Sequence, residues 1–149
     1  MICNVLFGEA FQIHVNRHDM KKIFTVEEAN RTLILVLQIA RDVQSGFHAL
    51  KVLRATDPGN EDERHKAISK IEHNLEELAQ VGCIFSDVGA GFVEFPAYFK
   101  GRPILLCWGV DEGHVSHWHY VKENCHDRRE VTEEILAGSN ANLFAEMVL

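Results

Sequence analysis

Residues 24–54 read FTVEEANRTLILVLQIARDVQSGFHALKVLR, and this stretch decides the fold. Thr25 is followed three residues later by Glu28, the spacing of a capping box, which predicts that a helix begins here. Apolar residues then alternate at intervals of three and four residues, as in a heptad seam: Val26, Ala29, Leu33, Val36, Ala40, Val43, Phe47 and Leu50. The pattern predicts one long helix that ends near Arg54.

A second helix is expected after the turn signal Asp57-Pro58-Gly59-Asn60. Its apolar seam consists of Ile68, Ile71, Leu75 and Leu78. Gly82 stands where a glycine commonly ends a helix. Two heptad-patterned helices joined by a short turn predict an antiparallel helical hairpin over residues 24–82.

The first half of the long helix carries more apolar residues than one seam needs: Ile34, Leu35, Leu37 and Ile39. A helix that is apolar on more than one face is covered on more than one face. The cover is either the C-terminal half of this chain or a second subunit. The distal half of the hairpin carries a mixed charge run that is most simply a solvated face. We therefore expect a non-enzymatic binding or interaction module, in which the hairpin docks a protein partner or self-associates.

Three short runs after Gly91 change to the period of β-strands, and they lie at residues 92–95, 104–108 and 115–120. Turn signals at Lys100-Gly101 and Asp111-Glu112-Gly113 separate them, which predicts an antiparallel meander. Pro96 lacks a backbone donor, so the first strand is expected at an edge of the sheet.

The chain is therefore expected to be α+β: a long antiparallel helical hairpin packed on a small three-stranded antiparallel β-meander, with a short C-terminal helix. Its 149 residues fit a single domain. Within it we expect a peripheral extension, the hairpin, the meander, and a C-terminal tail or short helix, at residues 1–19, 24–82, 91–121 and 130–149.

Composition narrows the class of protein. A formal net charge of -7 argues against nucleic-acid binding, which needs a clustered basic surface. The four cysteines form no C-x-x-C pair and are expected to be free thiols. No apolar run approaches the ~18 residues of a membrane span, and the first residues do not resemble a secretory signal. We expect a cytoplasmic protein that does not associate with membranes.

A polar row crosses the predicted meander. Hairpin loops of two and three residues set Glu94 opposite Cys107, and Cys107 opposite His117. His119 lies two residues along the same strand and therefore on the same face. Glu, Cys and His are ligand types for zinc or another borderline transition metal, and an H-x-H pair on a strand aims both rings one way.

Two interpretations of this row remain open. It is a metal site, which could activate a water and serve a metal-dependent hydrolase. Alternatively, it is a buried cysteine with nearby histidines and has no chemical role. A nucleophilic Cys107 or Cys125 beside a histidine is a further chemistry that spacing does not decide. Whether the protein is an enzyme stays open at this level.

Several short motifs occur in a recognisable order: residues 24–33 and 91–96, Gly101-Arg102, Leu106-Cys107-Trp108, Trp118-His119 and Arg128-Arg129. In this order and spacing the chain resembles, over about residues 22–129, the uncharacterised bacterial family called domain of unknown function 2203. The resemblance implies a small cytoplasmic protein with a helical hairpin followed by strands, and it implies no activity. It favours Glu94, Cys107 and His119 over His117 as site residues. One departure is the segment before the paired arginines, where relatives have glycines and this chain has Asn124, Cys125 and Asp127.

Overall fold

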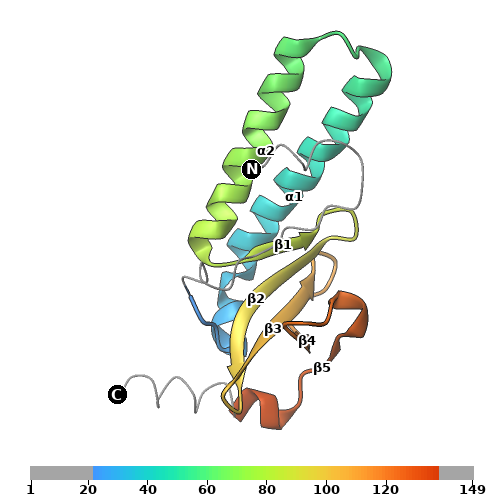
Figure 1. The fold of residues 1–149 in the computed structure, drawn as a ribbon. Helices are drawn as coiled ribbons and strands as arrows, with labels where there is room; N and C mark the ends of the chain where they lie inside the picture. The colour runs from blue at the N-terminus through green and yellow to red at the C-terminus, as the bar shows by residue number, and fades with distance from the viewer. Residues whose placement is uncertain (1–21, 138–149) are drawn as a thin grey trace.

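The computed structural model describes residues 22–137. Expectations for residues 1–19 and for the tail beyond residue 137 lie outside these described residues. Two long helices, α1 (Val26–Thr56) and α2 (Glu61–Val81), run side by side in opposite directions and extend beyond one end of a β-sheet (Figure 1).

The ends of the helices follow from local hydrogen bonding. The Thr25 side chain accepts a 3.0 Å bond from the Glu28 amide, which caps α1 as predicted. The Asn60 side chain caps α2 in the same way by accepting from the amide of Glu63. Gly82 ends α2 with φ 102°, a left-handed conformation that favours glycine, and this prediction is confirmed.

The sheet has five antiparallel strands in the order β1-β2-β3-β4-β5. They are β1 (Ile84–Asp87), β2 (Phe92–Phe99), β3 (Arg102–Gly109), β4 (His117–Tyr120) and β5 (Arg129–Glu130). The α+β class is confirmed, but the expectation of three strands is wrong. β1 and β5 are four and two residues long, too short to display a period of their own.

The expectation that the strand with Pro96 lies at an edge is also wrong. β2 lies between β1 and β3. The β1 ladder pairs only with residues 92–94 of β2, where Ile84 lies opposite Glu94. Pro96 is therefore beyond the end of β1, where its missing donor costs no ladder bond. Its carbonyl accepts a 2.7 Å bond from the Phe24 amide, which ties the start of α1 to the sheet.

The predicted strand registers are confirmed. Phe99 lies opposite Arg102, Glu94 opposite Cys107, and Cys107 opposite His117. The three-residue loop is wrong, because β4 begins only at His117 and the connection spans residues 110–116. Within this connection the Val115 amide donates to the side chain of Asn30 on α1 at 2.7 Å, so the helix holds the segment rather than β3.

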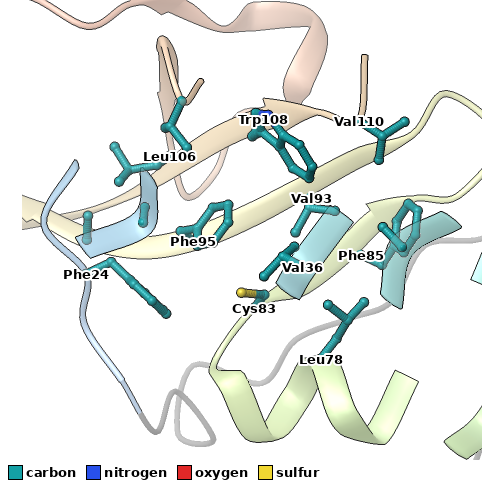
Figure 2. Close-up of a cluster of buried hydrophobic side chains, with 14 of the residues drawn as sticks. Phe24, Val36, Leu78, Cys83, Phe85, Val93, Phe95, Leu106, Trp108 and Val110 are labelled. Carbon is teal, nitrogen blue, oxygen red and sulfur yellow. The ribbon is translucent and has the colours of Figure 1, made fainter. Parts of the chain in front are cut away.

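One face of the sheet packs against both helices and forms the main core (Figure 2). Val36 of α1 and Leu78 of α2 lie against side chains of β1 and β2, and Phe95 meets the Phe24 ring edge-on at 5.3 Å. Residues 133–137 are helical, and Ile135 completes this core with 2% of its surface exposed. Among residues 22–137, no helix combines the length and apolar character needed to cross a membrane.

Candidate metal centre

The other face of the sheet carries a buried polar cluster. Because side chains alternate along a strand, Glu94 on β2, Cys107 on β3 and His119 on β4 point away from the face that packs on the helices. Glu94 is 8% exposed, and Cys107 and His119 are fully buried. Three neighbouring strands thus contribute one polar residue each to the same place.

A turn between β4 and β5 covers this cluster. It contains the 3-10 helix η3 (Cys125–Asp127), shown in orange-red in Figure 1. Asn124 and Asp127 stabilise the turn from both ends. The Asn124 side chain accepts from backbone amides of η3, and the Asp127 side chain accepts from the Asn124 amide. Glu123 accepts from the Tyr120 amide at 2.9 Å and holds the entry to the turn. These local bonds deliver Cys125 to the polar face, where it is 8% exposed.

Cys107, His119 and Cys125 form a group that could hold a metal ion. Their ligand atoms, two sulfurs and one ring nitrogen, all lie within 4.8 Å of one another. The two sulfurs are 2.7 Å apart, and Cys125 Sγ lies 3.8 Å from His119 Nε2. Two thiolates and an imidazole suit zinc and other borderline transition metals rather than calcium or magnesium.

Glu94 is the common acceptor of this group. Its Oε1 accepts from His119 Nε2 at 2.9 Å and from Cys125 Sγ at 3.2 Å. Cys107 in turn donates its thiol proton to Cys125. The thiols and the imidazole therefore form a directed chain of donors that ends on one buried carboxylate. A buried carboxylate with such partners is satisfied, and it is also placed to bind a cation that displaces those protons.

The ring of His119 is oriented by a second bond. Its Nδ1 donates to the Tyr120 carbonyl at 2.7 Å, which leaves Nε2 directed at the cluster. Burial opposes the charged imidazolium, but the hydrogen bonds to Cys125, Glu94 and the Tyr120 carbonyl raise the pKa of His119 to about 10. Without an ion, this raised pKa favours the imidazolium form of His119, which donates to Glu94.

Cys125 and Cys83 both have a raised pKa, but the physical causes differ. The hydrogen bond from Cys107 and then burial raise the pKa of Cys125. Burial, opposed by the charge of Lys22, raises the pKa of Cys83 to about 12. Cys83 lies in the apolar core on the opposite face of the sheet and has no part in the cluster.

His117 lies outside the ligand group, although the predicted register is correct. Its Nδ1 lies 2.8 Å from the Ser116 hydroxyl and 3.6 Å from Glu112 Oε2. Glu112 also pairs with Arg128. Burial opposes the charge of the Arg128 guanidinium, but Glu112 and then Cys107 raise its pKa.

Of the four predicted ligands, the structure thus brings together Glu94, Cys107 and His119. Cys125 is not among the metal ligands predicted from the sequence, where it is a candidate nucleophile only. Strand alternation cannot place a residue that arrives from a returning turn. Two sequence features could have indicated that Cys125 returns to the cluster. It follows His119 by six residues, and the capping pair Asn124 and Asp127 marks a turn around it.

Comparison with curated proteins gives no match, and comparison with solved structures gives none either. Residues 22–131 match the family described as "Uncharacterized conserved protein (DUF2203)". This match covers most of the chain, including both helices, all five strands and the four cluster residues. The chain therefore belongs to the DUF2203 family.

Proposed function

We propose that this protein binds one transition metal ion of the zinc class through Cys107, His119 and Cys125, with Glu94 as the fourth ligand. The observation that carries the proposal is the convergence of three buried ligand atoms within 4.8 Å of one another. Glu94 Oε1 lies 2.9 Å from His119 Nε2 and 3.2 Å from Cys125 Sγ, which puts a carboxylate oxygen beside them.

One ligand distance is already near that of a tetrahedral site, and another needs a movement of about 1 Å. Two thiolates on one zinc stand about 3.8 Å apart, because each Zn–S bond is about 2.3 Å long. The distance from Cys125 Sγ to His119 Nε2 is 3.8 Å, so this pair needs little adjustment. The sulfurs of Cys107 and Cys125 are 2.7 Å apart and would separate by about 1 Å around an ion. Cys125 lies on a three-residue turn, which can supply that movement.

A structural role fits this donor set better than hydrolysis does. A catalytic zinc keeps one position open for water, whereas structural sites are closed by four protein ligands. Glu94 would take the fourth position here, and all four residues are at most 8% exposed. A bound ion would join β2, β3, β4 and η3 at one point. We propose a reducing, cytoplasmic location for such a site, since Cys83, Cys107 and Cys125 are all free thiols.

Elemental analysis of protein purified without a metal-affinity tag tests this proposal. We expect about one zinc per chain in the parent protein, as a single four-ligand site requires. Cys107→Ser and His119→Gln should each lose the metal, and Cys83→Ala should keep it because Cys83 lies in the apolar core. Cobalt added to the metal-free protein should give the visible absorption of tetrahedral thiolate ligation. Metal far below one per chain, unchanged by Cys107→Ser, would disprove the site.

We also propose that α1 self-associates, with a second copy of the chain as its partner. Ile34 and Leu35 support this, because they are 89% and 54% exposed although both are large and apolar. Light scattering at tens of micromolar tests it. The parent protein should be dimeric and Ile34→Glu with Leu35→Gln monomeric, with unchanged helical circular dichroism. A parent protein that is monomeric at these concentrations overturns this second proposal.

A further inference from the structure

The contact between the sulfurs of Cys107 and Cys125 has a second chemical outcome. At 2.7 Å, their separation lies between the ~2.0 Å of a disulfide bond and the ~3.8 Å of two thiolates on one zinc. We propose that these two cysteines are a site of reversible oxidation by a hydroperoxide, and that the disulfide and the metal exclude each other. The second half of this inference rests on the metal site proposed above.

The two cysteines differ in how far they can move. Cys107 is in the middle of β3, which is paired on both sides by β2 and β4. Cys125 is on η3, and His126, the next residue of this short helix, is exposed. A short surface turn opens at lower free energy than a doubly paired strand. Cys125 can therefore approach Cys107 to form a bond or retreat from it to admit an ion, and it is the sulfur nearer to solvent.

The bond from Cys107 and burial raise the pKa of Cys125, so its thiol needs a base in the first step, and Glu94 provides it. Cys125 Sγ donates to Glu94 Oε1 at 3.2 Å, so the carboxylate can take the thiol proton as the sulfur attacks. With hydrogen peroxide, the Cys125 sulfur bonds to one oxygen, the O–O bond breaks, and the departing hydroxide recovers the proton from Glu94 as water. Cys125 is then a sulfenic acid.

Cys107 completes the reaction. Its sulfur attacks the sulfur of the sulfenic acid, the S–S bond forms and the S–O bond breaks. The leaving hydroxide takes the proton of the Cys107 thiol and departs as a second water. Two thiols have lost two electrons, and the peroxide has gained them. When an ion is bound, both sulfurs are already thiolates, and the two hydroxides released in the same oxidation take their protons from solvent. The ion then loses two of its ligands and leaves, because a disulfide sulfur does not replace a thiolate.

The test uses the full chain with Cys3→Ser and Cys83→Ala, which leaves Cys107 and Cys125 as its two thiols. In the metal-free arm, hydrogen peroxide should remove both thiols, lower the mass by about 2 Da and give a peptide that joins the two cysteines. In the zinc-loaded arm, a chromogenic zinc indicator should report one zinc released per disulfide formed. A thiol reductant should restore both thiols and zinc binding.

The outcomes separate the two proposals. A chain that forms the disulfide but never holds zinc supports the oxidation site and overturns the metal site. A chain that holds zinc but forms no Cys107–Cys125 disulfide when metal-free overturns the present inference and leaves the metal site standing. Adding Cys125→Ser to the same background should stop the mass at single-cysteine oxidation products. An intramolecular loss of 2 Da in that variant would also overturn the inference.

Discussion

Glu94 and Phe95 are adjacent in β2 and point to opposite faces of the sheet, where they meet different surroundings. Phe95 is fully buried in the apolar core, to which α1, α2 and four strands contribute side chains. Glu94 is almost as buried, but its surroundings are one histidine and two cysteines linked by hydrogen bonds. The stability of the apolar face thus depends on close packing of side chains, and that of the polar face on a few directed hydrogen bonds.

The difference teaches where each face tolerates change. The apolar face is stabilised by many weak contacts, so a residue can be replaced by another of similar volume at small cost. In the polar cluster, removal of one group leaves another buried without its partner. Predictions that alter one face at a time therefore test whether the two faces are independent.

The largest expected change in stability is that of Phe95→Ala. The substitution removes a fully buried ring that also meets Phe24 edge-on, and we expect it to lower the free energy of unfolding by about 3–5 kcal/mol. Urea denaturation measures this. Val52→Ala is the control, because Val52 is 46% exposed, lies outside the proposed self-association surface, and its loss should change stability by less than about 0.5 kcal/mol. Equal losses in both variants would contradict the described core.

The next largest effect is the pH dependence of the metal-free protein. The folded pKa of His119 is raised to about 10, above the unfolded value of about 6.5, so the folded state holds the proton more tightly. Stability from this pair is complete below about pH 6.5 and is lost as pH rises toward 10. The slope can reach about 1.4 kcal/mol per pH unit.

Urea denaturation at several pH values between 6.5 and 7.5 measures this slope, before the cysteines contribute. In His119→Gln the slope from this group should be absent in that interval. A parent protein whose stability is constant from pH 6.5 to 7.5 would show that His119 is not protonated as described.

The fold was predictable where a pattern repeats. The seam from Val26 to Leu50 and the turn at Asp57-Pro58-Gly59-Asn60 contain enough periods to predict both helices. β5 could not be predicted, because two residues carry no period and its pairing with Trp118 depends on the path of the preceding turn. β1 is four residues long and follows directly on the end of α2, so its alternation is equally weak.

The site was predictable to the same extent. Glu94, Cys107 and His119 lie within strands, so alternation and register place them on one face. His117 shares that face, but its ring binds Ser116 and Glu112 instead, a choice made by the conformation of residues 110–116. Cys125 arrives on a turn, where no periodicity applies. Side-chain direction within a strand follows from sequence, and long-range return of the chain does not.

Cys83 and Cys107 sharpen the comparison, because the same residue type is buried on both faces. Cys83→Ala removes one atom from the apolar core, so we expect a loss of about 1 kcal/mol and unchanged metal content. Because burial raises the pKa of Cys83 to about 12, its thiol should also resist alkylation at pH 8 in the folded protein. Peptide mapping by mass spectrometry measures this. Rapid labelling of Cys83 without unfolding would contradict its place in the core.

The smallest expected change in stability is that of Arg128→Gln, at the rim of the polar cluster. Arg128 pairs with Glu112 while its side chain is 23% exposed, and such partly solvated pairs contribute at most about 1 kcal/mol. Its interaction with Cys107 gives it a larger role in metal binding, because a cation beside a thiolate ligand stabilises the bound form. We expect the zinc affinity to fall about tenfold, measured by competition with a chelator.

Arg129→Gln is the matched control, since the neighbouring Arg129 pairs with Glu123 and stacks on Trp118 and Tyr120 on the other face. If both arginine variants lose affinity equally, the effect comes from net charge, and Arg128 has no specific role at the site.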